Sequence, residues 1–455
     1  MHDRKDDKVL KLLIKNGTIV CSGYRYKADI LAEDERIALI TAPGSLSETA
    51  ADQVIDAEGL YILPGVMDSH VHFRDPGHTY KEDFSTGSAA AAMGGVTTVY
   101  DMPNNMPRTV AVPELTEKLR AVDGKAYVDF ALYGLITNNN LDELLPLVDN
   151  GVRGFKCLMG ISAMNTPTGR DVDIWQAMRR LKDRGVTISV HAEDTQIVDA
   201  VRERLIAEGR NDAQAHMESH PPISETIAVE RAILAAEDCG GKIHIAHISS
   251  AGTVELIRQA KRRGINVTCE VGPHNLYFTD SDYARKGSSM FMNPPIRSKE
   301  DRDAIFRGIH DGTVDMIATD HAPHSDEEKS TQNGVFKAKS GFCGVETEVA
   351  VMLTLVNRGL LSLEEYVRIS SENVAKLFNL YPRKGCIAVG SDADFTIVDM
   401  GKKWRVDRDS LHSRSKITAF DGEELTGGPV YTIVRGNVVM DHGVLSDKAM
   451  GIFLR

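Results

Sequence analysis

The 455-residue sequence lacks any long hydrophobic run. No stretch approaches the ~20 consecutive apolar residues that a membrane-spanning helix needs, so we expect no membrane partner. The chain begins Met-His-Asp-Arg-Lys-Asp-Asp-Lys, which mixes both signs of charge and does not resemble a secretory signal peptide. The sequence therefore predicts a soluble, cytoplasmic protein.

An excess of basic side chains is also missing. The formal net charge is -12 at pH 7, whereas a protein that binds the phosphates of nucleic acids usually presents a basic face. We therefore expect no nucleic-acid partner.

Cysteine is scarce and shows no organised spacing. No two of the six cysteines form a C-x-x-C pair, so neither a disulfide framework nor a zinc knuckle is indicated. We expect free, mostly buried thiols at all six positions, which are Cys21, Cys157, Cys239, Cys269, Cys343 and Cys386.

The two ends of the chain share a sequence pattern, in which short apolar segments are separated by turn residues. Residues 12–14 and 19–21 flank Asn16-Gly17, and residues 431–434 and 438–440 flank Arg435-Gly436-Asn437. We predict that residues 1–64 and 385–455 fold together as one small β-domain.

Between these ends, residues 65–384 alternate short apolar segments with amphipathic segments of helical length. This alternation indicates repeated βα units and an α/β fold. About 320 residues of it suit an eight-stranded parallel barrel better than an open sheet, although periodicity alone leaves a doubly wound sheet open. The strands that the pattern predicts best are residues 97–100, 187–191, 242–247, 266–270 and 316–319.

Polar residues capable of binding a metal stand at the ends of several predicted strands. His70 and His72 follow an apolar run at i and i+2, so both imidazoles lie on one face of the strand. An H-x-H pair alone is weak evidence, but His191, His247 and Asp320 end three further predicted strands. Barrel enzymes gather their catalytic groups at the C-terminal ends of strands, so we predict that these five residues meet in one metal site.

Lys156 ends another predicted strand among apolar neighbours. A desolvated lysine becomes neutral and nucleophilic and can take up carbon dioxide as a carbamate, which can bridge two metal ions. His244 points away from His247 along its strand, and we assign it to packing.

Taken together, these residues resemble the amidohydrolase superfamily over essentially the whole chain, from Pro64-Gly65-Val66-Met67-Asp68 to Ala393-Asp394-Phe395. Within the superfamily the sequence most resembles dihydroorotase, with allantoinases and dihydropyrimidinases as near relatives. The motifs that carry this resemblance are His70-Val71-His72-Phe73-Arg74-Asp75-Pro76-Gly77, Asp101-Met102-Pro103-Asn104, Met292-Asn293-Pro294-Pro295 and Thr319-Asp320-His321-Ala322-Pro323-His324.

The resemblance implies a (β/α)8 barrel with a flanking β-sandwich and a centre of two zinc ions, with Mn2+ or Co2+ as possible substitutes. His70, His72 and Asp320 would hold one ion, and His191 and His247 the other. N6-carboxylated Lys156 and a hydroxide would bridge the two ions. Asp320 would also be the general base.

The resemblance further implies that the enzyme interconverts N-carbamoyl-L-aspartate and (S)-dihydroorotate in de novo pyrimidine (UMP) biosynthesis. Arg74 points to an acidic ring substrate, because a fixed guanidinium matches a carboxylate bidentately. His324 is a candidate for the other side of that carboxylate, Asn104 for an amide hydrogen bond, and Asn293 for recognition of the ring.

One departure from the dihydroorotase pattern keeps other functions open. Many bacterial dihydroorotases of this long type have an aspartate where this chain has Lys156, whereas allantoinases, dihydropyrimidinases and other dihydroorotases share the lysine. An allantoinase or a hydantoinase of dihydropyrimidinase type is therefore the alternative, and a non-catalytic scaffold is a second one. Relatives of this type are often homo-oligomers, as dimers or tetramers.

Two segments after Asp320 are predicted to close over a small-molecule substrate. Residues 325–340 are polar and contain glycine, which suits a lid. Gly341-Phe342-Cys343-Gly344 would approach the substrate through backbone groups.

Overall fold

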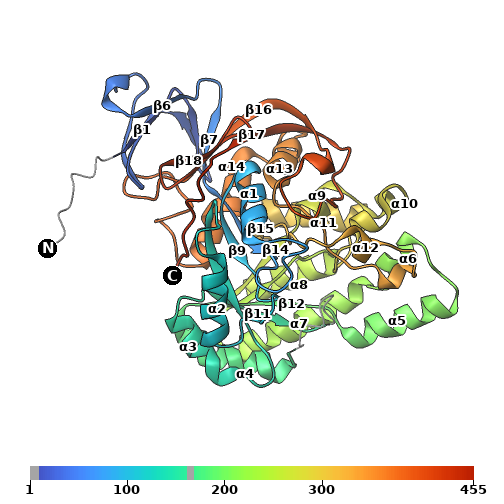
Figure 1. The fold of residues 1–455 in the computed structure, drawn as a ribbon. Coiled ribbons are helices and arrows are strands. Elements are labelled where there is room, and N and C mark those ends of the chain that lie inside the picture. The colour runs from blue at the N-terminus through green and yellow to red at the C-terminus, as the bar shows by residue number, and fades with distance from the viewer. Residues whose placement is uncertain (1–9, 161–168) are drawn as a thin grey trace.

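The computed structural model describes residues 10–160 and 169–455. The charged N-terminal segment of the sequence analysis lies outside these residues. Figure 1 shows a barrel surrounded by helices, with a smaller body at the upper left that contains strands from the N-terminal and C-terminal parts of the chain, such as β1, β6 and β18. No helix of the described residues is long and apolar enough to cross a membrane.

A parallel β-barrel forms the centre of the molecule. Its strands follow one another in chain order from β8 to β15, and each pairs with the next. Val71 at the end of β8 bridges His321 just beyond β15, and the His72 amide donates to the His321 carbonyl at 2.8 Å, so the sheet closes. This closure confirms the predicted barrel. Its strands are β8 (Val66–Val71), β9 (Val96–Asp101), β10 (Asp129–Leu135), β11 (Gly154–Leu158), β12 (Thr187–His191), β13 (Ile243–Ile245), β14 (Val267–Val271) and β15 (Met316–Ile317).

Helices cover the outside of the barrel and bury its strands on that side. Helix α8 shows the pattern that places them: Ser250 caps its first turn by accepting from the Thr253 amide, and Val254, Ile257 and Ala260 form its buried face. The larger helices are α1 (Phe84–Met93), α2 (Val112–Val122), α4 (Asp171–Leu181), α5 (Thr195–Ala207), α7 (Pro222–Cys239), α8 (Ala251–Arg262), α11 (Lys299–His310) and α13 (Glu348–Asn357). The shorter ones are α3 (Leu144–Asp149), α6 (Ala213–Glu218), α9 (Pro273–Tyr277), α10 (Tyr283–Lys286), α12 (Asp326–Lys329), α14 (Leu363–Val367) and α15 (Asn373–Leu377).

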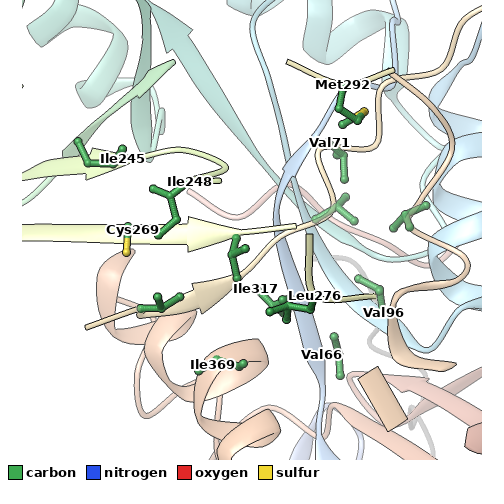
Figure 2. Close-up of a cluster of buried hydrophobic side chains, with 14 of the residues drawn as sticks. Val66, Val71, Val96, Ile245, Ile248, Cys269, Leu276, Met292, Ile317 and Ile369 are labelled. Carbon is green, nitrogen blue, oxygen red and sulfur yellow. The ribbon is translucent and has the colours of Figure 1, made fainter. Parts of the chain in front are cut away.

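Two clusters of buried apolar side chains stabilise the barrel. Figure 2 shows part of the main cluster, to which Val66 and Val71 of β8, Ile317 of β15 and Ile369 of the segment after α14 all belong. A second cluster closes the base, where the Phe378 ring lies 4.1 Å from the Tyr100 ring between centroids. The base is therefore filled by side chains, and only the opposite end of the barrel is available for a site.

The smaller domain is built from both ends of the chain, as predicted. One sheet has the order β5-β4-β1-β6 and the other the order β19-β18-β17-β16-β7-β2-β3. Antiparallel pairing of β7 with β16 joins the N-terminal strands to the C-terminal ones. The strands are β1 (Lys11–Lys15), β2 (Thr18–Val20), β3 (Arg25–Lys27), β4 (Asp29–Glu33), β5 (Arg36–Thr41), β6 (Gln53–Asp56), β7 (Tyr61–Pro64), β16 (Phe395–Arg405), β17 (Glu424–Val434), β18 (Asn437–Asp441) and β19 (Val444–Leu445).

A buried ionic cluster ties this domain to the base of the barrel. Lys384, which is 2% exposed, lies 2.8 Å from Asp129 of β10, 2.5 Å from Asp394 and 3.3 Å from Asp392. Arg435 lies 3.1 Å from the same Asp129. Buried carboxylates need such partners, so the two cations fix how the domains meet.

Candidate metal centre and active site

All ten residues predicted for the site line one cavity at the C-terminal end of the barrel. The cavity measures about 550 Å³ with its mouth, which suits a small ring-shaped ligand. Its lining consists of His70, His72, Arg74, Asn104, Lys156, Leu158, His191, His247, Asn293, Asp320, Ala322, His324, Ser340 and Gly341.

One group of candidate ligands forms around Asp320. Its Oδ1 atom lies 3.3 Å from Nε2 of His70 and 3.1 Å from Nε2 of His72. The ligand atoms of these three residues all lie within 4.8 Å of one another, and all three side chains are buried. This is the spacing expected of groups that share one ion.

A second group faces the first across Lys156. The Lys156 amine lies 3.4 Å from Nε2 of His70, and Nδ1 of His191 lies 3.2 Å from Nε2 of His247. The rings of His70 and His247 lie 5.4 Å apart between centroids, so the two groups adjoin. The fold thus brings together the six candidate ligands from the ends of five strands, β8, β11, β12, β13 and β15.

The backbone is strained where three of these side chains enter the cavity. Arg74, His247 and Asp320 have φ angles of 60°, 35° and 48°, in the left-handed region that side chains other than glycine rarely adopt. β13 and β15 end sooner than predicted, so His247 and Asp320 lie just beyond their strands. The strain turns both side chains inward, which regular strand geometry would not do.

The environment sets the charges of the candidate ligands. Burial lowers the pKa of Lys156 to about 8, although Glu270 and Asp320 oppose the shift. Burial would raise the pKa of Asp320, but the surrounding His70, His72 and His247 outweigh it and hold this pKa below its ordinary value. Burial lowers the pKa of His72 to about 3. The site therefore combines the carboxylate of Asp320 with a neutral imidazole at His72 and an easily neutralised amine at Lys156.

This donor set fits divalent metal ions of the zinc type. Neutral imidazole and carboxylate are ligands that such ions prefer, and their nitrogen and oxygen atoms lie 3.2 to 3.3 Å apart, as in His191–His247 and His70–Asp320. The residues present therefore suit the metal centre that the sequence analysis expects.

The substrate side of the cavity carries buried polar atoms without a partner. Nε of Arg74, Oδ1 of Asn293 and Nε2 of His324 make no hydrogen bond with the described residues. Arg74 is only 4% exposed, so its charge is removed from bulk water. Such atoms are costly to bury unless a ligand or water satisfies them, so this side of the cavity suits a polar group.

The segment expected to act as a lid docks along the edge of this cavity. Glu328 of α12 lies 2.6 Å from Lys81 and 3.3 Å from Nδ1 of His324. The neighbouring Lys329 donates to the carbonyls of Phe291 and Gly341, at 3.2 and 2.8 Å. Helix α12 thus holds several walls of the cavity together.

Two buried glutamates behind the candidate ligands were not predicted from the sequence. Nδ1 of His70 bonds to Glu270, and Nε2 of His191 lies 3.0 Å from Glu193. His244, assigned to packing, lies 3.0 Å from the same Glu270. Glu270 ends a predicted strand and could have been found by that signal, whereas Glu193 lies past a strand end and carries none.

Comparisons with known proteins agree with this geometry. Residues 61–439 match the model of the amidohydrolase family. The chain is 37% identical to an L-hydantoinase of Paenarthrobacter aurescens, covering 97% of each chain, and 37% identical to a dihydroorotase of Lactobacillus gasseri, covering 95% of this chain and 99% of that one. An allantoinase of Solibacter usitatus is 35% identical, with 97% and 96% covered.

Among solved structures, the L-hydantoinase (dihydropyrimidinase) from Arthrobacter aurescens superposes with a TM-score of 0.94 at 37% identity. The match covers 97% of this chain and 99% of the other.

Proposed function

The chain belongs to the amidohydrolase family and hydrolyses cyclic amides, and we propose that its substrate is dihydroorotate, which it interconverts with N-carbamoyl-L-aspartate. The observation that carries this choice is the buried guanidinium of Arg74, whose Nε makes no hydrogen bond with the described residues. A ring that bears a carboxylate would supply the missing anion. Hydantoin and allantoin rings bear none.

His70, His72 and Asp320 would hold one zinc ion, and His191 and His247 the other, with carboxylated Lys156 shared between them. Mn2+ or Co2+ would suit the same imidazole and carboxylate groups. When bound, the two ions supply Lewis acidity, which makes water a nucleophile near neutral pH and polarises the amide carbonyl.

The protein's own groups would move the proton and place the ring. Asp320, as a carboxylate, accepts a proton from the attacking water and passes it to the ring nitrogen, which leaves poorly unless protonated. Arg74 pairs with the substrate carboxylate, and His324 flanks it. Asn104 and Asn293 donate or accept hydrogen bonds at the ring.

Hydantoin hydrolysis is the second candidate. It is favoured by the TM-score of 0.94 with a solved L-hydantoinase and by values of 0.89 to 0.91 with several further hydantoinase and dihydropyrimidinase structures. The metal centre and Asp320 would serve both reactions alike, so only the carboxylate end of the cavity distinguishes them.

The test measures ring opening of dihydroorotate, hydantoin, allantoin and dihydrouracil by the zinc-loaded protein with bicarbonate present. We expect dihydroorotate to be preferred. Arg74→Ala should lower kcat/KM for dihydroorotate by about 30- to 5000-fold, since a buried charged pair contributes about 2–5 kcal/mol. Arg74→Lys keeps the positive charge but not the planar set of guanidinium N–H donors. It should therefore retain part of the activity that Arg74→Ala loses.

Turnover of hydantoin or allantoin without dihydroorotate would contradict the assignment and leave the metal mechanism standing.

We also propose a homo-oligomer, a dimer or a tetramer, as in relatives of this type. Light scattering from the purified protein measures this directly.

A further inference from the structure

Two of the four candidate histidine ligands are backed by buried glutamates. Nδ1 of His70 bonds to Oε1 of Glu270, and Nε2 of His191 lies 3.0 Å from Oε2 of Glu193. The glutamates are 1% and 3% exposed, so water does not compete for these bonds.

Each glutamate is held in turn by a second buried histidine. Oε2 of Glu270 lies 3.0 Å from Nε2 of His244, and Oε1 of Glu193 lies 2.8 Å from Nδ1 of His220. The Ser69 hydroxyl also donates to Oε2 of Glu270, at 3.0 Å. The same His-Glu-His arrangement therefore occurs twice, once behind each half of the metal centre.

The glutamates decide which nitrogen of each ligand carries the proton. A carboxylate can only accept, so the outward nitrogen of His70 or His191 must be an N–H. The inward nitrogen then keeps its lone pair. These inward atoms are Nε2 of His70, 3.3 Å from Asp320, and Nδ1 of His191, 3.2 Å from His247. The bond to the glutamate also holds the imidazole rings of His70 and His191 in one orientation, as is usual for histidines that bind metals.

The other two histidines have no such support. Nδ1 of His72 and Nδ1 of His247 are buried and make no hydrogen bond with the described residues. Each half of the centre thus pairs one histidine that is held by a glutamate with one that is not.

We propose that Glu270 and Glu193 are positioning residues that each secure a different metal ion, Glu270 the ion at His70 and His72 and Glu193 the ion at His191 and His247. This inference rests on the proposed metal centre. It adds that the affinity of each ion is controlled separately, from behind its own histidine.

The test replaces each glutamate by methionine, which has a similar length and cannot accept a hydrogen bond from the ligand. Zinc per chain is measured by elemental analysis after dialysis against a series of buffered free zinc concentrations. In Glu193→Met we expect one ion to be lost at 10- to 100-fold higher free zinc than in the wild type, and likewise in Glu270→Met. Anomalous diffraction at the zinc edge should show the remaining ion at His70 and His72 in the first variant, and at His191 and His247 in the second.

Two further variants separate positioning from general damage. Glu348 is also a fully buried glutamate, and neither of its oxygens bonds to the described residues, so Glu348→Met should leave both ions in place. Glu193→Gln keeps an oxygen that can accept from His191 and should restore much of the affinity. If a methionine variant fails to fold, His220→Leu and His244→Leu remove the second histidine that holds each glutamate. These variants should weaken binding of the same ions.

The inference is overturned if the wild type holds two ions and each variant holds both with unchanged affinity. It is equally overturned if each variant weakens the two ions to the same extent, because that result indicates a merely structural role. A wild type that binds no zinc with bicarbonate present would instead refute the metal centre itself.

Discussion

Carbon dioxide should react with Lys156 in the metal-free protein at a pH where ordinary lysines are inert. The amine is buried at a strand end, and burial lowers its pKa to about 8. Carbamate forms only from the neutral amine, since the ammonium has no lone pair to attack carbon dioxide. The uptake should therefore follow the deprotonation of this one group.

The pKa fixes the size of the effect. At pH 7 a group of pKa 8 is about one tenth neutral, whereas a lysine at its ordinary value of 10.5 is neutral to about 0.03%, roughly a 300-fold difference. Burial disfavours the charged form of Lys156 and so lowers its pKa. With a pKa of about 8, the neutral fraction of Lys156 rises about fivefold between pH 7 and pH 8 and levels off near pH 9.

The assay is 13C NMR of the metal-free protein under labelled carbon dioxide, with the dissolved gas held constant as the pH is raised. One carbamate signal should grow through about pH 8 and be absent in Lys156→Arg. Lys329 provides the matched control, because burial lowers its pKa to about 7 yet its amine faces the carbonyls of Phe291 and Gly341. Lys329→Met should keep the signal. A spectrum that Lys156→Arg leaves unchanged, or a Lys156-dependent signal that appears only above pH 10, would refute the reasoning; the N-terminal α-amine, with an ordinary pKa of about 7.7–8.0, gives its own signal in every variant.

Three further predictions concern the fold and the cavity. Lys384→Met leaves Asp129 and its neighbouring carboxylates short of a buried cation and should lower the free energy of unfolding by about 3–5 kcal/mol, measured by urea denaturation. Gly341→Ala places a Cβ 2.4 Å from the Ala322 carbonyl at a φ of +126°, at a cost of about 1–3 kcal/mol, and should lower kcat/KM while zinc content stays unchanged. Removal of zinc by a chelator should lower Tm, because each ion at 100 times its Kd adds about 2.7 kcal/mol, and re-addition should restore it.

The barrel and its ligands could be predicted because the sequence repeats a simple physical pattern. Buried parallel strands are apolar along their whole length, so a histidine or an acid at the end of such a run stands out. His191 and Asp320 were predicted in this way. Because the ends of barrel strands meet at one edge, the sequence also predicts that the two residues lie close together. The outer part of β16 was missed because its residues are largely exposed and lack that apolar signal, and the first half of β17 because it contains Gly427-Gly428-Pro429, residues typical of turns.

Only the tertiary structure decided how those ligands are held. Glu270 lies 200 residues from His70 in the sequence, and the barrel strands bring the two into contact. The left-handed backbone at Asp320, with a φ of 48°, likewise could not be predicted, because aspartate adopts this conformation only occasionally. Local patterns thus determined which residues reach the cavity. Their orientation came from long-range contacts, because the partners of each buried polar atom are fixed only when distant strands close on one another.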